Sequence, residues 1–201
     1  APAPATDPPP PAAPPVPAPP RTVPPGVAPP LLGRTAVATP VRGRVLIRRP
    51  GARAFAPLAG AASVPLGSEV EVRDGAIALQ FTTDRRGRRA SAVASGGRFV
   101  VRQPRRPGRI DRGQRPGTLV LSGPFAGCAR PGARTAAAAA GPGGPVAAAA
   151  ARRRRRGRRG RRLQVRADGS IKTKGRWGAA IVRGTRWTVV DRCPADRRAG
   201  T

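Results

Sequence analysis

The chain of 201 residues contains no histidine, no methionine and no tyrosine, and only two cysteines. Without histidine, the Ser-His-Asp and Cys-His catalytic arrangements are excluded, and so are zinc sites that use imidazole ligands. Two cysteines are also too few for a four-cysteine zinc site. The composition therefore favours a protein that is not an enzyme, and we expect no cofactor and no metal.

Aromatic residues are scarce, with four phenylalanines and two tryptophans. Any core must therefore be built mainly from valine, leucine, isoleucine and alanine. Two blocks have the composition to fold, residues 41–128 and 163–193, and together they suffice for one small domain with one core. No apolar run approaches the length of a membrane-spanning helix.

Acidic residues are also few, since nine Asp and Glu stand against 39 Lys and Arg, for a net charge of +30. Only Lys172 and Lys174 are lysines. Dominance of Ala, Gly, Pro and Arg is what a GC-rich coding sequence produces, so compositional drift and selection for a partner both stay open as origins of the charge. In either case such a surface attracts polyanions, namely nucleic acid, anionic lipid or acidic wall polymers.

Three segments are too biased in composition to form a core. Residues 1–40 begin with a stretch in which 15 of the first 30 residues are proline, which predicts a disordered, polyproline-type tether. Residues 129–162 consist almost wholly of Ala, Gly, Pro and Arg and are expected to be a disordered insertion. Residues 194–201 form a polar tail. The tether is interpreted either as a spacer or as a terminus without a specific role.

The two foldable blocks contain short runs in which apolar residues occupy every second position, separated by Gly, Pro and Asp turns. Asp74-Gly75 is the strongest two-residue hairpin signal, Asp168-Gly169 predicts another hairpin, and two strands are expected to meet at Gly184. Roughly seven to ten short antiparallel strands predict an all-β fold, a small roll or sandwich. The positions expected to face the core are Val45, Ile47, Val70, Val72, Ile77, Leu79 and Phe81.

Glu69 and Glu71 are the only closely spaced pair of carboxylates. On a strand they share one face, which would allow acid/base chemistry. We favour the alternative that they lie on an exposed polar face, opposite Val70 and Val72, and pair with arginines.

Cys128 and Cys193 each follow a predicted strand, near the ends of the two foldable blocks. In an exported protein two cysteines usually pair, and a bridge closing about 65 residues would contribute roughly 3 to 5 kcal/mol. The small residues at the start and the absence of methionine fit a secretory signal removed before Ala1, or a fragment. The alternative is two free thiols in a cytosolic protein.

An arginine run precedes the second block and is the strongest electrostatic feature of the sequence. As a clamp on a polyanion it would steepen the salt dependence of binding by about 0.9 in log–log slope for each phosphate neutralised. No aromatic platform or recognition helix accompanies it, so only non-specific nucleic-acid binding at low salt is expected, and a solvated loop is the alternative. The run comprises Arg152, Arg153, Arg154, Arg155, Arg156, Arg158, Arg159, Arg161 and Arg162.

Four motifs occur in order between about residues 41 and 193. They are a Gly-x-Val-x-Val-like opening from Gly43, VPLGSEV over 64–70, GGRFVV over 96–101, and a Val-Arg-Gly-Thr-x-Trp-x-Val segment. In this order they resemble FecR-like extracytoplasmic domains, and are similar to a version in exported proteins of GC-rich actinobacteria that ends in Asp-Arg-Cys, as Asp191 to Cys193 do here. The residues that match the last motif are Val182, Arg183, Gly184, Thr185, Trp187 and Val189.

The resemblance implies a β-rich module outside the cytoplasm that acts by binding. In the best-known members it relays a surface signal to a membrane partner that controls a sigma factor, but these 201 residues include neither the cytoplasmic portion nor the membrane helix of such a relay. We therefore expect an exported module that binds an envelope protein or an acidic polymer. The alternatives are an arginine-rich cytoplasmic protein associated with nucleic acid, and a truncated protein without retained function. Trp187 is interpreted as a core residue, and Trp177 stays open.

Overall fold

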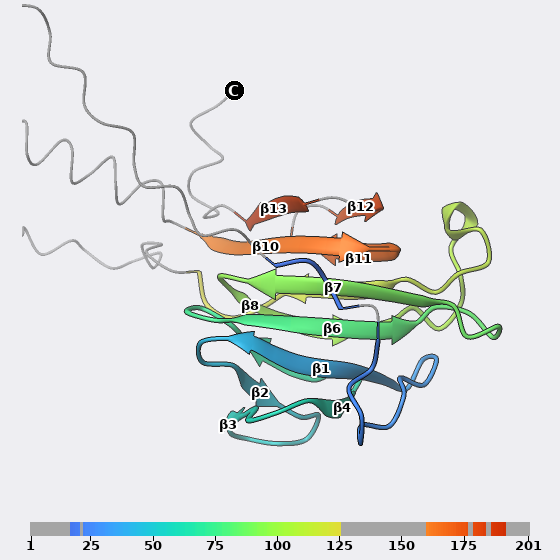
Figure 1. Ribbon diagram of the computed structural model, residues 1–201. Helices are drawn as coiled ribbons and strands as arrows, with labels where there is room; N and C mark the ends of the chain where they lie inside the picture. Colours follow the sequence, from blue (N-terminus) through green and yellow to red (C-terminus); the bar gives the residue numbers. More distant parts are fainter. Residues whose placement is uncertain (1–16, 21, 126–159, 177–178, 184–185, 192–201) are drawn as a thin grey trace, which may run out of the picture.

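A computed structural model describes residues 17–20, 22–125, 160–176, 179–183 and 186–191. These residues form two β-sheets packed face to face, as Figure 1 shows. Helical structure in the described part is limited to the 3-10 turn η1 (Arg109–Asp111). The predicted all-β sandwich is confirmed. None of the described helical structure is long and apolar enough to cross a membrane.

Sheet A has six strands and sheet B has seven. Neighbouring strands are antiparallel, except that β9 and β11 run parallel. The order in sheet A is β13 (Arg186–Asp191), β10 (Arg161–Asp168), β7 (Arg89–Ser95), β6 (Ala76–Thr82), β1 (Thr35–Arg42) and β4 (Ala62–Pro65). The order in sheet B is β12 (Ala179–Arg183), β11 (Ser170–Lys174), β9 (Gly117–Leu121), β8 (Arg98–Arg102), β5 (Glu69–Glu71), β2 (Leu46–Arg48) and β3 (Ala56–Pro57).

The core lies between the sheets and consists mostly of aliphatic side chains, with Phe81 and Phe99 as its largest fully buried members. Trp187 is partly buried and packs against this core, and its indole Nε1 donates a hydrogen bond to Thr173 Oγ1 at 3.0 Å. The interpretation of Trp187 as a core residue is therefore confirmed, whereas Trp177 lies outside the described residues. All the positions expected to face the core are buried, namely Val45, Ile47, Val70, Val72, Ile77, Leu79 and Phe81.

The two hairpins predicted at Asp-Gly pairs are wrong. Asp74-Gly75 connects β5 of sheet B to β6 of sheet A, and Asp168-Gly169 connects β10 of sheet A to β11 of sheet B. Strands that change sheet show the same alternation as a hairpin, because each strand still turns one apolar face inward. A Cβ atom at Gly75 would lie 2.7 Å from Arg44 O, so a close backbone approach, and not a hairpin turn, requires this glycine.

The strands of residues 161–191 together form one long hairpin that bends over both sheets, here named the folded hairpin. β11 pairs with β12 in sheet B, and β10 pairs with β13 in sheet A. The strands expected to meet at Gly184 thus belong to different sheets, while Gly184 and Thr185 themselves lie outside the described residues. The folded hairpin joins the rest of the sandwich through β7 in one sheet and β9 in the other.

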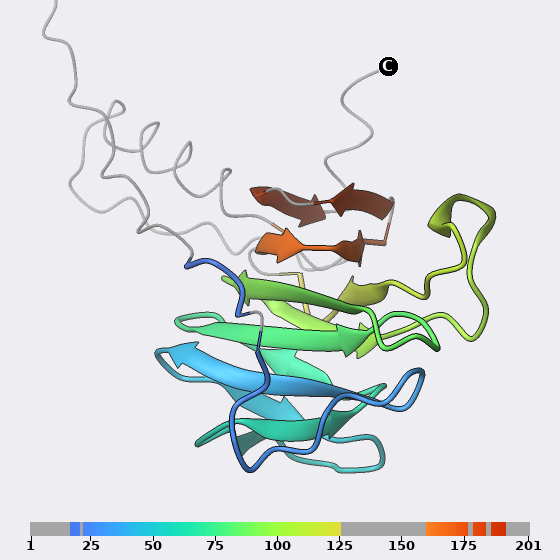
Figure 2. The ribbon, with the colours of Figure 1, turned by 45° about the vertical axis from the view of Figure 1, so that its right-hand side comes forward.

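The predicted tether, residues 1–40, extends too far, because β1 begins at Thr35 and an N-terminal segment (22–34) crosses the outer face of sheet A (Figure 2). Gln80 Nε2 donates hydrogen bonds to the backbone oxygens of Pro20 (3.1 Å) and Thr22 (2.7 Å), and Thr82 Oγ1 donates to Pro30 O at 2.5 Å. On β6 and β7 the residues that face away from the core are buried as well, Ala78 among them. Because a proline-rich sequence has no alternation of apolar residues, the packing of this segment against sheet A could not be predicted from its composition.

Candidate anion-binding surface

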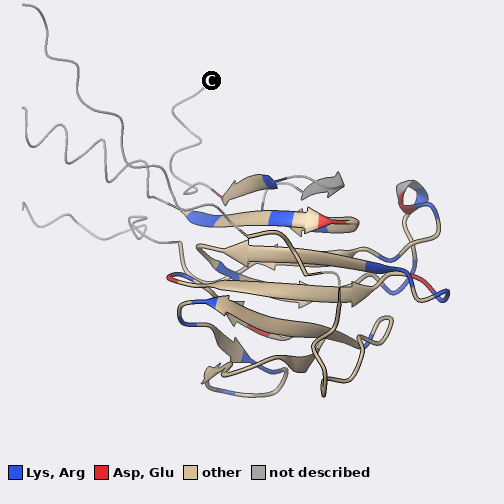
Figure 3. Cartoon of the chain, in the orientation of Figure 1, with Lys and Arg blue, Asp and Glu red and all other residues tan. Residues whose placement is uncertain are grey.

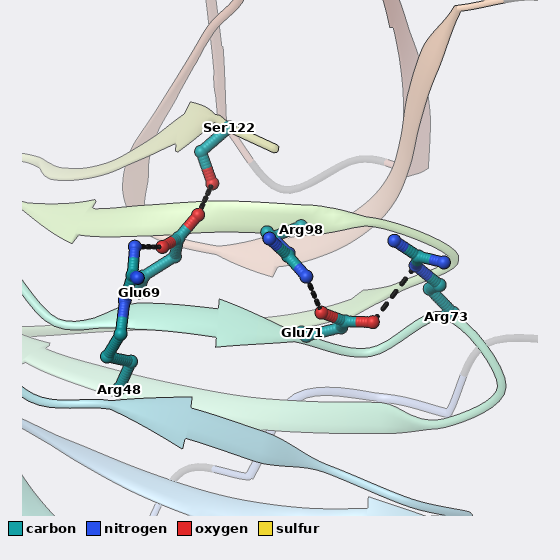
Figure 4. Close-up of polar contacts among 6 residues, drawn as sticks. All are labelled: Arg48, Glu69, Glu71, Arg73, Arg98 and Ser122. Atoms are coloured by element: carbon teal, nitrogen blue, oxygen red, sulfur yellow. Dashed lines mark hydrogen bonds and ion pairs between the residues drawn. The ribbon is translucent and has the colours of Figure 1, made fainter. Parts of the chain in front are cut away.

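Glu69 and Glu71 lie on the outer face of sheet B, and each forms an ion pair with an arginine of a neighbouring strand (Figure 4). Glu69 pairs with Arg48 and accepts a hydrogen bond from Ser122 Oγ at 2.7 Å, while Glu71 pairs with Arg98 and also with Arg73, whose Nε lies 3.0 Å from Oε1. The predicted pairing with arginine is confirmed. Glu69 is buried, however, in contrast to the expected exposed face.

Phe55 adds an aromatic ring to this glutamate–arginine array. The guanidinium carbon of Arg48 lies 5.0 Å from the ring centroid, and that of Arg98 lies 4.7 Å from it. Each arginine is thus held both by a carboxylate and by a π face. These two guanidinium groups stabilise sheet B, and because their contacts are already made within the fold, they are poorly placed to bind an external anion.

Other acidic side chains are also used inside the molecule. Asp84 Oδ1 accepts hydrogen bonds from the backbone N–H groups of Arg86 and Arg88, both at 3.0 Å. The buried Asp111 accepts from Gly108 N at 2.8 Å, and its Oδ1 lies 2.7 Å from Lys172 Nζ. Asp84 Oδ2 also lies 3.6 Å from Arg88 Nε. In the described part of the chain the arginines therefore outnumber the carboxylates that could neutralise them.

Many of the exposed arginines gather on two loops at one end of the sandwich (Figure 3). The loops connect β6 to β7 and β8 to β9, and we call them the arginine loops. Their bases are joined, because Arg115 N donates to Thr83 O at 2.6 Å and Gln103 Nε2 donates to Thr82 O at 2.8 Å. The exposed arginines on the two loops and the adjoining strand ends are Arg85, Arg86, Arg88, Arg89, Arg102, Arg105, Arg106, Arg109 and Arg112.

The β8–β9 loop is fixed by side chains at its base and near its tip. The amide of Gln103 accepts a hydrogen bond from Gly33 N at 2.6 Å and donates a second one to Arg115 O, also at 2.6 Å. It thereby connects the N-terminal segment, the end of β6 and the loop itself. The pair between Asp111 and Lys172 ties the far part of the loop to β11. The loop's arginines therefore project from a braced backbone.

The predicted arginine run is described only at its end, where Arg161 and Arg162 begin β10. Arg161 faces inward: its guanidinium carbon lies 4.0 Å from the Phe125 ring centroid, and Nη1 donates to Leu121 O at 3.3 Å. Arg161 is therefore not available to an external anion, whereas Arg162 is exposed. The other predicted residues, Arg152, Arg153, Arg154, Arg155, Arg156, Arg158 and Arg159, lie outside the described residues, as do Cys128 and Cys193.

Of the Val-Arg-Gly-Thr motif the structure describes Val182 and Arg183, which end the edge strand β12, whereas Gly184 and Thr185 lie outside the described residues. Val182 pairs with Ile171, and Arg183 pairs with Ser170, at the end of β12 where the chain leaves sheet B. This position fits a structural role at the change of sheet. The two arginine loops are not predicted as a site from sequence, because each has the composition of an ordinary polar turn. The density of arginine in two separate loops was the available signal, but their contact is long-range and only the fold reveals it.

Searches of protein-family models, curated proteins and solved structures find nothing that matches the chain. The resemblance to FecR-like domains therefore stays a prediction. The function has to be argued from the arrangement of the charged residues.

Proposed function

We propose that the chain is a non-enzymatic, exported binding module whose arginine loops hold an acidic polymer or an acidic protein surface in the cell envelope. One observation carries the proposal. Nine exposed arginines gather on two loops joined at their bases and on the adjoining strand ends, while of the two carboxylates in these loops Asp84 pairs with Arg88 and Asp111 with Lys172. Guanidinium groups form bidentate hydrogen bonds with phosphate and carboxylate, so a cluster of them suits an anionic chain.

The position of the cluster supports the proposal as well. Braced loops lose little conformational freedom when they bind, so more of the interaction free energy remains as affinity. The extracytoplasmic setting rests on the FecR-like motifs. The absence of enzymatic activity is supported by the lack of histidine and by the engagement of Glu69 and Glu71 with arginines.

The binding is tested with long-chain polyphosphate as the probe, titrated at several salt concentrations. A triple variant of the β8–β9 loop, Arg105→Gln with Arg106→Gln and Arg109→Gln, should reduce the log–log salt slope by about two units, at about 0.7 per lost contact. The matched control removes the same charge from exposed positions that flank β2, by Arg44→Gln, Arg49→Gln and Arg53→Gln. Equal weakening by both triples would contradict a defined site, because net charge alone would explain the binding.

The location is tested by fractionating the source cells and measuring the mass of the protein by mass spectrometry under non-reducing conditions. The envelope or secreted fraction should contain the chain with Cys128 and Cys193 joined, a state two mass units lighter than the dithiol. Recovery from the cytosol with two free thiols would refute the envelope setting. It would favour the nucleic-acid-associated alternative, for which the same arginine loops offer phosphate contacts.

A further inference from the structure

One residue of the arginine loops has a backbone conformation that its residue type does not favour. Arg112, which follows η1 in the β8–β9 loop, has φ 48° and ψ 45°. In the part of the chain that the structure describes, it is the only residue other than glycine with a positive φ. This left-handed region costs free energy for a residue with a Cβ atom, and glycine, asparagine and aspartate occupy it most readily. An arginine at this position therefore lowers the stability of the loop.

The turn that contains Arg112 has a defined geometry. Gly113 also has a positive φ, of 77°, and Gln114 N donates a hydrogen bond to Asp111 O at 2.9 Å. Two consecutive positive φ angles closed by such a bond are the arrangement of a type I′ turn, in which Asn-Gly is a preferred central pair. Arg112-Gly113 has the favoured residue at the second position but not at the first. The turn would thus form more easily with asparagine at position 112.

The residue before the turn holds Arg112 in this conformation. The buried Asp111 carboxylate accepts a hydrogen bond from Gly108 N at 2.8 Å and pairs with Lys172 of β11, and Asp111 N donates to Gly108 O at 3.0 Å. These contacts fix the backbone on one side of Arg112 to the loop and to sheet B. Strained backbone persists where the surrounding structure determines it in this way, and such positions cluster at functional sites.

The side chain of Arg112 is available to a ligand. It is exposed and forms no hydrogen bond or ion pair with the residues that the structure describes, whereas Arg88 of the other arginine loop lies beside Asp84. A guanidinium group on a fixed backbone loses less conformational freedom on binding than one on a mobile chain. Its planar fork can form two parallel hydrogen bonds with one oxyanion, a geometry that the ammonium group of lysine cannot reproduce.

We infer that Arg112 is the specificity-determining residue of the arginine loops and forms a bidentate contact with one phosphate group of a phosphate polymer. The inference rests on the proposed function, because it names a ligand class and a contact within that same surface. A polymer with a charge on every unit also supplies an anion for each surrounding arginine, which favours phosphate over the scattered carboxylates of a protein surface. The other exposed arginines, such as Arg106, contribute mainly their charge, which a lysine can replace.

The experiment titrates the full chain with long-chain polyphosphate at several salt concentrations. Arg112→Lys keeps the charge and the strained backbone but removes the fork, so it should weaken binding about fivefold and leave the log–log salt slope unchanged. The matched control, Arg106→Lys in the same loop, should change the affinity by less than about twofold. Poly-L-glutamate of equal charge should bind the unaltered chain more weakly than polyphosphate.

A second pair of variants tests the backbone strain. Arg112→Asn and Arg112→Gln both remove one positive charge, but only asparagine readily adopts the left-handed conformation. The melting temperature of Arg112→Asn should therefore exceed that of Arg112→Gln by about 2 to 4 °C. Both variants should bind polyphosphate more weakly than the unaltered chain does. A more stable variant that binds less tightly distinguishes a ligand contact from a structural role.

Several results would overturn the inference. Equal effects of Arg112→Lys and Arg106→Lys would mean that Arg112 contributes charge alone, as expected if it reflects only the arginine-rich composition of the chain. Equal melting temperatures of the Asn and Gln variants would remove the argument from backbone strain. Tighter binding of poly-L-glutamate than of polyphosphate would overturn the assignment to phosphate. These results would leave the proposed function standing, whereas failure of the unaltered chain to bind either polymer would overturn the proposed function itself.

Discussion

At the scale of single residues, Asp191 joins the two ends of the folded hairpin. Its buried carboxylate accepts hydrogen bonds from Arg176 N at 3.0 Å and 2.9 Å, and Oδ2 lies 4.0 Å from Arg161 Nη1. Arg161 begins β10, whereas Arg176 follows β11 near the opposite end of the hairpin. A Cβ atom at Gly175 would lie 2.2 Å from Asp191 Oδ1, so only glycine allows this approach.

Asp191→Asn should therefore lower the free energy of unfolding by about 1 to 3 kcal/mol, because an amide N–H₂ replaces one acceptor oxygen and leaves buried polar groups unsatisfied. The measurement is urea denaturation followed by circular dichroism. The control is Asp74→Asn at an exposed turn, which should change stability by less than about 0.5 kcal/mol. Equal effects of the two substitutions would show that Asp191 is not a link in the hairpin.

The contacts of some single residues could be predicted from sequence, and those of others could not. The arginine partners of Glu69 and Glu71 follow from strand alternation and charge, and the inward position of Trp187 follows from the shortage of large core residues. The role of Asp191 could not be predicted, because its partners lie far away along the chain. The inward position of Arg161 was missed for the same reason, since Phe125 lies across the insertion from it.

At the scale of elements, the sequence predicts which residues face inward but not which sheet a strand joins. The alternation of apolar residues correctly predicts which side chains of β5, β6, β10 and β11 face the core. It also predicts that β5 pairs with β6 and β10 with β11, which is wrong because the two strands of each pair lie in different sheets. A two-residue turn and a change of sheet have the same local signal. The choice is made by contacts with other segments, such as the approach of Gly75 to Arg44 O.

The N-terminal segment gives the second prediction, because Gln80 holds it through two bonds from one amide nitrogen. In Gln80→Glu that nitrogen becomes an oxygen facing the backbone oxygens of Pro20 and Thr22, so the segment should detach. Hydrogen exchange of residues 22–34, measured by mass spectrometry, should become about 5 to 150 times faster, as expected for the loss of about 1 to 3 kcal/mol.

The control is Gln164→Glu, the same change on β10 of sheet A, which should leave exchange in residues 22–34 unaltered. If both variants accelerate exchange equally, the added negative charge is responsible and Gln80 does not hold the segment. Slow exchange in both variants would place the anchor of the segment elsewhere, with the Gln103 bond to Gly33 as the next candidate.

At the scale of the whole molecule, both sheets contain strands from before and after the insertion. β10 pairs with β7, and β11 pairs with β9, so residues 160–191 complete a sandwich that begins at Thr35. A shared apolar core explains this assembly, since Leu163, Val165, Ala167 and Ile171 pack in one cluster with residues of the first block. Composition indicated that the core would be aliphatic and that charge would dominate the surface. It could not indicate that two distant loops would combine their arginines, because that depends on the order of the strands.

The surplus of positive charge sets the last prediction, which concerns salt. Salt screens ion pairs such as Arg98 with Glu71, which lowers the stability of the fold. Salt also screens the repulsion among the many arginines, which raises the stability of the fold. With 39 basic residues and nine acidic ones, pairs of like charges outnumber pairs of opposite charges. The melting temperature should therefore rise as sodium chloride increases from about 10 mM to about 500 mM, a range over which the Debye length falls from about 30 Å to a few Å. The β8–β9 loop triple variant should start from a higher melting temperature at low salt and rise less, because three repelling charges are gone. A melting temperature that falls with salt in the unaltered chain would mean that the internal ion pairs, and not the repulsion, control its stability.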